Sequence, residues 1–399
     1  MFLCRTLFVL ASAIWIAIES PVALATPAKD GSESRVRQVL DKFIAAKDIP
    51  GAVTLVHQAG QPAETVAIGA ANVESATPMT PETLFGVMSM TKPISATALM
   101  ILVDEGKVSV DDPVEKYIPA FADAKTTSGE PVRGLKIRHL LTHTSGLTGD
   151  QACVDSLEAT AKMLAARPFG FQPGDKWEYS PSMNIVGRIV EIASGKPFDE
   201  FLRERIFMPL TMNDTTFHLT DQQRRRLAAL YKKCDDGTSL VPAERWAGAG
   251  EPGAVPSPSG GLFSTAGDMD RFYQMILHGG ELDGMRIVSA DAVRQMTTVQ
   301  TGDLTTGFTP GNGWGLGWCV VREPQGVTGM LSPGTFGHGG AYGTEAWIDP
   351  VKRRVFVLMF QRADIGNSDG SDIRQEFQQA AVDGLENDKD HAPVPSKNE

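Results

Sequence analysis

Ser89 and Lys92 lie three residues apart at the start of an apolar stretch, and this spacing gives the pair a chemical use. Helical spacing of apolar residues begins at Met90 and runs to Gly106, so both side chains should project from one face at a helix N-terminus. Pro93 fits this helix because it falls in the first turn, where a missing N–H costs little. A serine hydroxyl is a weak nucleophile until a neighbouring base removes its proton, and Lys92 is the candidate base.

Lys92 can serve as that base only if the pKa of its amine falls. Burial in an apolar helix and the positive end of the helix dipole both disfavour the ammonium form. The free N–H groups of the first turn can also stabilise the oxyanion that forms when the serine attacks a carbonyl. A Ser-x-x-Lys tetrapeptide by itself fits a helix cap and a surface lysine equally well, so the pair needs support from the rest of the chain.

Around this pair the chain reads as a helix, strands, a large helical block, strands and a final helix. Apolar spacing predicts an amphipathic helix over residues 34–47, and strands over 51–57 and 64–70. A hairpin is predicted from 344 to 360, followed by a helix over 371–385. Strands at both ends of the chain predict one sheet that combines them, with the helical block packed beside it.

These elements define the expected domain organisation. One domain over residues 26–386 should contain a sheet part (about 34–85 and 260–386) and a helical part (about 86–259). Residues 1–25 have the short positive start, the apolar stretch and the small residues of a cleavable signal peptide, which predicts export to a periplasm or the medium. An uncleaved anchor is the alternative. The polar, proline-containing end over 387–399 is predicted to be disordered.

Composition narrows the class of protein. The chain has 399 residues, 42% hydrophobic and 21% charged, which is typical of a soluble globular protein. A net charge of −11 without a basic face argues against nucleic acid or an anionic membrane as a partner. Cleavage would leave Cys153, Cys234 and Cys319, which form one disulfide or none. No Cys or His pair has metal-ligand spacing, so neither a metal nor another cofactor is expected.

Residues 89–93 (Ser-Met-Thr-Lys-Pro) resemble the nucleophile motif of the penicillin-recognising serine hydrolases, which include class C β-lactamases, DD-peptidases and family VIII carboxylesterases. The likeness covers nearly the whole mature chain. It continues, in the family's order, through residues 104–107, 111–114, 137–147, 209–210, 260–266 and 313–317. Several separate motifs in one order are more specific than any single motif.

The second motif of this family is a tyrosine followed by x-Asn. Tyr179 matches the tyrosine, but the asparagine position holds Pro181, which has no side-chain amide. This departure resembles the esterase branch. As a phenolate or a hydrogen-bonded phenol, Tyr179 would share a proton with Lys92 and pass it to the leaving group. A buried tyrosine with a satisfied hydroxyl is the alternative.

The third motif, Lys-Thr-Gly in β-lactamases, aligns with His338, Gly339 and Gly340, which the resemblance identifies as substrate-binding. The glycines allow close backbone approach at a strand edge. The resemblance also implies an oxyanion hole made by the backbone N–H groups of Ser89 and Ala341. Because His338 replaces a permanent cation with a group that is only partly charged near neutrality, we expect weak β-lactam turnover and better ester turnover.

The resemblance implies the α+β fold called β-lactamase/transpeptidase-like, an antiparallel sheet flanked by helices plus a helical subdomain, with the site between them. It implies a serine hydrolase that forms an acyl-enzyme on Ser89 of a small-molecule ester or amide. A carboxylesterase is the first expectation. The second is a D-amino-acid peptidase, a β-lactamase or a hydrolase of small linear amides. The third is a catalytically silent binding or scaffold protein on the same fold.

Three other sequence features suggest alternative functional sites. Ser368 lies in a Gly-x-Ser-x-Gly pentapeptide, but too few residues follow it to supply the rest of an α/β-hydrolase. His139 and His143 have the spacing of a helical metal pair, yet no acidic third ligand is near, so capping or buried-polar roles are favoured. Trp314 and Trp318 fit either core packing or a cleft wall.

Overall fold

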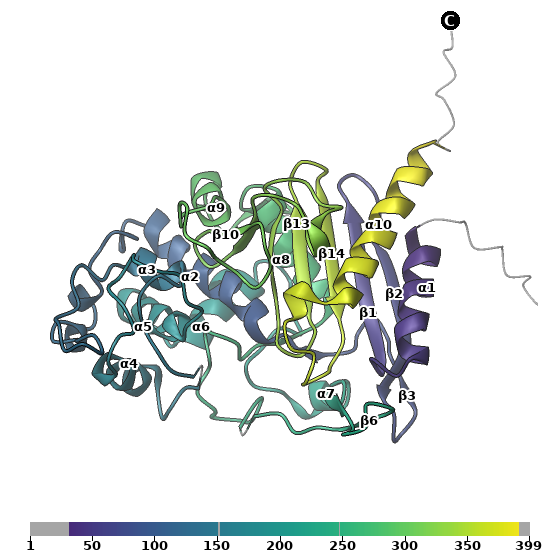
Figure 1. The fold of residues 1–399 in the computed structure, drawn as a ribbon, viewed down its shortest axis with the longest axis horizontal. Coiled ribbons are helices and arrows are strands. Elements are labelled where there is room, and N and C mark those ends of the chain that lie inside the picture. The colour runs from purple at the N-terminus through teal and green to yellow at the C-terminus, as the bar shows by residue number, and fades with distance from the viewer. Residues whose placement is uncertain (1–31, 151, 247, 391–399) are drawn as a thin grey trace, which may run out of the picture.

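One antiparallel sheet forms the centre of the molecule, and it combines strands from both ends of the chain, as predicted (Figure 1). The computed structural model describes residues 32–150, 152–246 and 248–390, so the expected signal peptide lies outside the described residues. In the described chain the sheet has eight strands, which follow one another in this order: β10 (Asn312–Trp314), β11 (Cys319–Val321), β12 (Phe336–Gly339), β13 (Glu345–Asp349), β14 (Arg354–Met359), β1 (Gly51–Gln58), β2 (Glu64–Asn72) and β3 (Thr77–Pro78).

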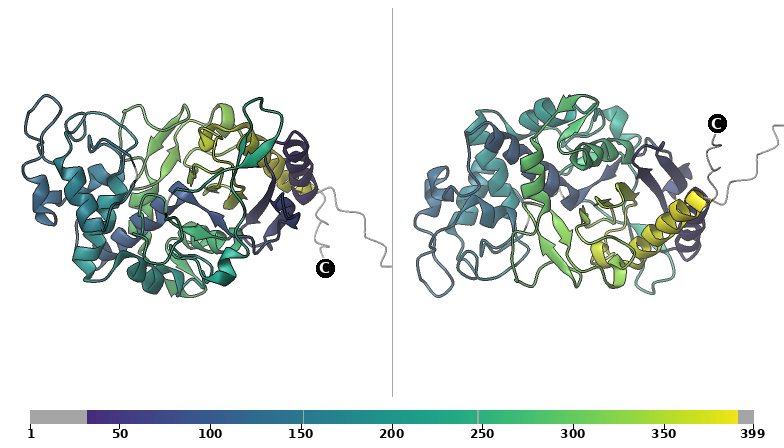
Figure 2. Two further views of the ribbon diagram at one scale, coloured as in Figure 1. Left: turned by 90° about the horizontal axis from the view of Figure 1, so that it is seen from below. Right: turned by 90° about the horizontal axis from the view of Figure 1, so that it is seen from above.

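Both faces of the sheet are covered by helices, because its central strands are apolar on both sides. Val53 and Leu55 of β1 join the core on one face, which α8 (Ala266–Leu277) covers. Ala52 and Val56 of the same strand turn to the other face, where α1 (Ser32–Ala45) packs against α10 (Asp372–Asp390). Figure 2 shows these two terminal helices side by side. The period of two in side-chain direction explains this division.

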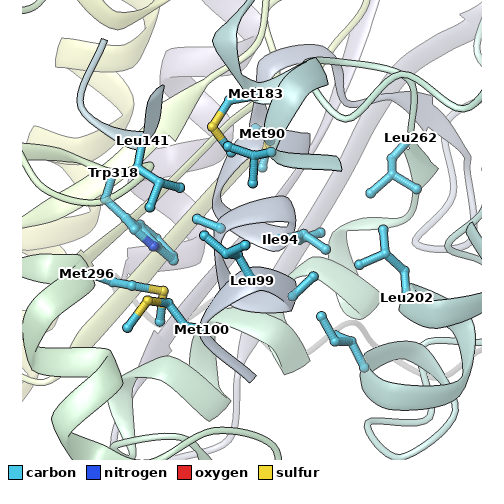
Figure 3. Close-up of a cluster of buried hydrophobic side chains, with 14 of the residues drawn as sticks. Met90, Ile94, Leu99, Met100, Leu141, Met183, Leu202, Leu262, Met296 and Trp318 are labelled. Carbon is cyan, nitrogen blue, oxygen red and sulfur yellow. The ribbon is translucent and has the colours of Figure 1, made fainter. Parts of the chain in front are cut away.

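The helical part lies at the other end of the molecule, and α2 (Thr91–Asp104) lies at its centre. Its first twelve residues are all buried, because other helices and loops surround it. In Figure 3, Met90, Ile94 and Leu99 lie among side chains from distant segments. The other α-helices in the described part of the chain are α3 (Ile137–Leu141), α4 (Leu157–Ala166), α5 (Ser182–Ser194), α6 (Phe198–Leu202), α7 (Asp221–Arg224) and α9 (Ala290–Thr297).

Short elements complete the fold. The two-stranded pairs are β4 (Phe85–Gly86) with β7 (Phe263–Ser264), β5 (Tyr231–Lys233) with β6 (Leu240–Pro242), and β8 (Glu281–Leu282) with β9 (Met285–Arg286). The single helical turns are η1 (Met88–Met90), η2 (Val114–Lys116), η3 (Pro119–Phe121), the π-helical η4 (Arg203–Phe207), η5 (Gly326–Thr328) and η6 (Ser368–Gly370). The β4–β7 pair is the one that bears on the site, because it leads directly into Ser89.

Two expected boundaries differ from the structure. The helical part ends near η4 rather than at residue 259, and the chain then returns to the sheet, where Leu227 pairs with Leu84 and Tyr231 with Arg362. The glycines and prolines between residues 241 and 260 disfavour helix formation in this segment. Helix α10 ends at Asp390, so the first residues of the expected disordered tail are helical and the remainder lies outside the described residues.

Two further expectations concern disulfide bonds and membrane-spanning helices. Cys153, Cys234 and Cys319 are free thiols in the structure. None of the helices in the described chain is both long enough and apolar enough to span a bilayer.

Candidate active site

Ser89 lies in η1, at the point where β4 passes into α2. Two contacts hold the residue before this turn: the Val87 N–H donates to Leu262 O at 3.0 Å, and the Thr344 hydroxyl donates to Val87 O at 3.0 Å. Met88 then adopts a positive φ of 52°, a conformation that non-glycine residues rarely take. This constrained turn directs Ser89 out of the helix axis, and its side chain is partly exposed although both neighbouring methionines are buried.

Lys92 Nζ lies 3.1 Å from Ser89 Oγ and 2.6 Å from Ser259 O. The lysine is 0% exposed, and burial lowers the pKa of its amine from 10.5 to about 7. A substantial fraction of the molecules therefore carries a neutral amine at neutral pH. Such an amine can donate one N–H to Ser259 O and still offer its lone pair to the Ser89 proton. This is the arrangement that the sequence required of the pair.

Tyr179 reaches the same place from the loop ahead of α5, and Lys92 Nζ lies 4.6 Å from the centre of its ring. The ring is partly exposed, but the hydroxyl is buried and lacks an aligned hydrogen-bond partner in the described chain. Burial raises the pKa of the phenol well above 10, and this outweighs the opposing influence of the nearby Ser89 hydroxyl. Burial therefore favours the neutral phenol, one of the two states that the sequence left open.

Aromatic rings surround Tyr179 and hold it in place. The centre of its ring lies 4.4 Å from that of His143, 4.9 Å from that of Phe308 and 6.1 Å from that of Trp314. Trp314 is fully buried, so it packs behind the site, whereas Trp318 stacks on Phe272 in the main core at 6.1 Å. Neither tryptophan forms an open cleft wall, but the exposed Phe308 does reach the surface beside Tyr179.

His338 lies on β12 with its side chain only 1% exposed, between the rings of Tyr179 and Trp314. Its Nδ1 lies 2.7 Å from Gly339 O, so the tautomer that donates there leaves a lone pair on the buried Nε2. Burial, aided by Lys92, lowers the pKa of this imidazole to about 3. Burial therefore favours a neutral His338 at neutral pH, whereas the sequence suggested a partly charged group.

Gly339 and Gly340 are needed for close packing at the end of β12. A β-carbon on Gly340 would lie 2.4 Å from Val87 O and 2.3 Å from Thr344 Oγ1, which no real side chain tolerates. The absence of a side chain thus lets Gly340 pack against Val87 and Met88 of the Ser89 turn, and the next residue, Ala341, is exposed. In the described chain the Ala341 N–H meets no acceptor, as an oxyanion donor requires.

Gly339 packs against η6, the turn that holds the Gly-x-Ser-x-Gly serine. A β-carbon there would lie 2.7 Å from Ser368 Oγ and 2.4 Å from Asp369 Oδ1. Ser368 is 6% exposed and supports the back of β12, which agrees with its rejection as a nucleophile. Asp369, Glu345 and Arg374 form a buried charge cluster here, and Asp369 helps to raise the pKa of Tyr179. Nothing in the sequence identified this cluster.

Asn184 is a second residue that the sequence did not identify. It lies on α5, and its side-chain Oδ1 accepts a hydrogen bond of 3.1 Å from the Ser259 N–H. Ser259 in turn presents its carbonyl to Lys92. A polar connection therefore runs from α5 through one peptide unit to the amine. Asn184 thus places a side-chain amide near Lys92, although the asparagine position of the tyrosine motif holds Pro181. The only sign of this in the sequence was that Asn184 follows Tyr179 by five residues.

Replacing Asn184 should change the environment of Lys92 without removing any reacting group. Asn184→Asp keeps an acceptor for Ser259 N–H but adds a negative charge, which stabilises the ammonium form. We expect the acid limb of the pH profile of kcat/KM to move to higher pH by about one unit. Ser95→Ala is the control, because it removes the 2.8 Å bond to the neighbouring carbonyl, Pro258 O, and should leave the limb in place. An unmoved limb in the aspartate variant would contradict this role.

The two histidines with metal-like spacing have structural roles. His139 Nδ1 accepts a hydrogen bond of 3.1 Å from the Lys136 N–H at the start of α3, and His143 is buried beneath Tyr179. Within the described ranges, no group of three or more His, Cys, Asp or Glu side chains is placed to hold a metal ion. Surface recesses near Lys162, Ile373 and Phe207 contain none of the three central side chains, so hydrogen bonding and burial define the site rather than cavity size.

The sheet, the helical part and the Ser-Lys-Tyr cluster between them define a β-lactamase/transpeptidase-like protein, which confirms the predicted fold class. The β-lactamase family model matches residues 36–381, and the chain belongs to this family of hydrolases.

Two relatives and one solved structure are similar to this chain. Esterase EstB of Burkholderia gladioli is 31% identical over 372 residues, which cover 84% of this chain and 92% of that protein. A putative D-alanyl-D-alanine carboxypeptidase of Escherichia coli strain K12 is 32% identical over 316 residues, which cover 73% of this chain and 72% of that protein. The solved structure of EstCE1, a hydrolase with promiscuous acyltransferase activity, has a TM-score of 0.77 at 24% identity and covers 89% of this chain and 99% of that one.

Proposed function

We propose that this protein is a serine carboxylesterase that forms an acyl-enzyme on Ser89. The observation that carries the proposal is the fully buried Lys92 amine, with a pKa of about 7, at 3.1 Å from the serine hydroxyl. A lysine buried without a carboxylate partner destabilises the fold, so a functional role is the better explanation for its presence there. Activation of a nucleophile is such a use.

Acylation follows from the protonation states of the cluster. The neutral Lys92 amine takes the Ser89 proton while the oxygen attacks the ester carbonyl carbon. The negative charge moves to the carbonyl oxygen, where the backbone N–H groups of Ser89 and Ala341 donate to it. Collapse of this intermediate breaks the bond to the alcohol oxygen. Tyr179, a neutral phenol in contact with the resulting ammonium, gives its proton to the alkoxide and takes one from Lys92.

Deacylation reuses the same groups in reverse. Lys92 is neutral again after the alcohol leaves, so with Tyr179 it can take a proton from a water molecule that attacks the acyl carbon. The bond between that carbon and Ser89 Oγ then breaks, and the proton returns to the serine oxygen. No metal or organic cofactor is needed. The expected partner is a small-molecule ester, and the expected location is outside the cytoplasm if residues 1–25 are cleaved during export.

An ester substrate is favoured over a β-lactam by the end of β12. The neutral, buried His338 offers no positive charge to a substrate carboxylate on that side of the site. Pro181 also removes a side-chain amide that could bind the substrate. Similarity to EstB supports the same choice. Similarity to a putative D-alanyl-D-alanine carboxypeptidase keeps hydrolysis of D-amino-acid peptides as the second candidate.

A substrate panel tests this proposal. We expect purified protein to hydrolyse a short-chain p-nitrophenyl ester with a kcat/KM at least about tenfold above that for nitrocefin or a D-Ala-D-Ala peptide, because β12 lacks a cation. Faster hydrolysis of nitrocefin or of the peptide would reject the esterase assignment in favour of the amide hydrolases. A fluorophosphonate probe should label Ser89. Failure of labelling, together with no turnover of any substrate, would favour a silent binding protein on this fold.

A further inference from the structure

Arg245 lies beside Gly86, three residues before Ser89, and uses only part of its hydrogen-bonding capacity. Its Nη1 donates to Gln361 Oε1 at 2.6 Å, and its Nη2 donates to Ala228 O at 2.5 Å. A guanidinium has five N–H donors, so several remain without a partner in the described chain. The side chain is half-buried, with the rings of Phe263 and Tyr342 at 5.9 and 5.8 Å from its guanidinium carbon.

No carboxylate neutralises this guanidinium in the described chain. Arg224 and Arg226 lie in the same segment of the chain, between η4 and β7, and pair with Glu251 and Asp214 respectively. For Arg245, burial is the main influence and lowers the pKa to about 10. The neighbouring Tyr342 supplies no negative charge at neutral pH, because burial raises the pKa of its phenol. The group still carries its positive charge at neutral pH. A partly desolvated cation with free donors and no counter-ion is unfavourable in a resting protein and becomes favourable when an anion binds.

Its neighbours link Arg245 to the two chain segments that carry Ser89 and Ala341. Gln361, which accepts from Arg245, also bonds both the N–H and the C=O of Gly86, three residues before Ser89. A β-carbon on Gly86 would lie 3.0 Å from Arg245 Nη1. Tyr342 immediately follows Ala341, the proposed oxyanion donor, and its ring lies 6.1 Å from that of the exposed Trp246. Arg245 thus packs against Gly86, which leads into the Ser89 turn, and against the ring of Tyr342, which follows Ala341.

The position of Arg245 relative to Tyr179 indicates which part of the substrate Arg245 can contact. Tyr179 protonates the departing alcohol, so the alcohol must lie near Tyr179 and its neighbour Phe308. Arg245 makes no contact with either ring and packs instead on Phe263 and Tyr342. The acyl chain, on the opposite side of the carbonyl from the alcohol, is the part that can extend toward the guanidinium.

We propose that Arg245 is an anion-binding residue of the acyl subsite and that the preferred substrates are esters whose acyl chain ends in a carboxylate, such as monoesters of dicarboxylic acids. This inference rests on the proposed esterase function. The half-buried Tyr342 and the exposed Trp246 supply the apolar surface along which the methylene groups of such a chain would lie. A charge-assisted hydrogen bond in these surroundings discriminates strongly against a neutral chain of the same length.

Matched esters test the inference. Mono-p-nitrophenyl succinate, glutarate and adipate are compared with p-nitrophenyl butyrate, valerate and hexanoate, after subtraction of spontaneous hydrolysis. We expect the kcat/KM ratio of anionic to neutral ester to exceed about tenfold for at least one chain length in the wild type, because one charge-assisted bond contributes that much. Arg245→Gln should lower this ratio about tenfold or more, and Arg245→Lys should retain part of it.

The ratio corrects for losses of folding or catalysis, because both esters use the same reacting groups. Arg294→Gln is the matched control, since Arg294 is exposed on α9 and pairs with Asp291, and it should keep the wild-type ratio. Turnover of neutral esters with no anionic preference, or a ratio unchanged in Arg245→Gln, would overturn the anion subsite and leave the esterase proposal standing. Failure to turn over either ester together with an unlabelled Ser89 would remove both.

Discussion

Ser89→Ala is expected to lower kcat/KM for the preferred p-nitrophenyl ester by about 10⁴-fold or more, because removal of the attacking oxygen abolishes the acyl-enzyme route. The substitution removes one partly exposed oxygen, so the free energy of unfolding should change by less than about 1 kcal/mol. Steady-state hydrolysis and thermal unfolding of the same preparation measure the two effects. Mass spectrometry of wild type treated with a slowly released ester should locate the acyl group on Ser89.

Ser368→Ala is the matched control for this prediction. Ser368 lies in the only other sequence context that is typical of a nucleophile, but it is buried behind β12 in contact with Gly339. Its substitution should leave ester hydrolysis within a few-fold of wild type, since only a packing contact is lost. The reverse pattern, with activity lost in the Ser368 variant and retained in the Ser89 variant, would refute the assignment of the nucleophile.

Lys92→Met is expected to reduce kcat/KM by about 10³-fold or more, because methionine keeps the shape of the side chain and removes the base. In the wild type, kcat/KM should fall about tenfold per pH unit below pH 7, where the amine with a pKa of about 7 becomes protonated. A pH profile between 5 and 9 measures this limb. A limb near pH 4 to 5 would instead indicate a carboxylate as the base.

The same variant should be more stable than the wild type, which separates a lost base from a damaged fold. The pKa of Lys92 falls from 10.5 to about 7 on burial, which costs about 4 kcal/mol of folding free energy at neutral pH. Between pH 7 and 10.5 the unfolded chain binds more protons at this site than the folded one, so wild-type stability rises with pH. The advantage of Lys92→Met in the free energy of unfolding should therefore shrink across that range. Chemical denaturation at pH 7 and pH 10 measures it.

Much of the local structure could be predicted from the sequence. The spacing of Ser89 and Lys92 placed both on the first turns of a helix, and η1 followed by α2 has them there. Apolar periodicity predicted α1, β1 and the β13–β14 hairpin to within a few residues. These features succeed because side-chain neighbours within a helix or a hairpin are determined by residues close in sequence.

Boundaries failed where the local pattern was weak. The return segment between η4 and β7 contains many glycines and prolines, and its place beside the sheet depends on long-range pairing such as Leu84 with Leu227. Local periodicity carries no information on such pairing.

The chemical state of the site was decided by the tertiary structure. From the sequence, Tyr179 could be a phenol or a phenolate and His338 could carry part of a charge, but burial makes both neutral. Lys92 acquires its low pKa because α5, the Ser259 segment and the other surrounding elements exclude water from it. Arg245 likewise lacks a counter-ion because the groups that the fold places beside it, the Gln361 side chain and the Ala228 carbonyl, are uncharged.

The sequence by itself therefore determined which groups this protein carries and the order in which they occur along the chain. Only the folded chain decided which of them are charged, because desolvation depends on every atom that surrounds a group, and most of those atoms come from residues far away in sequence.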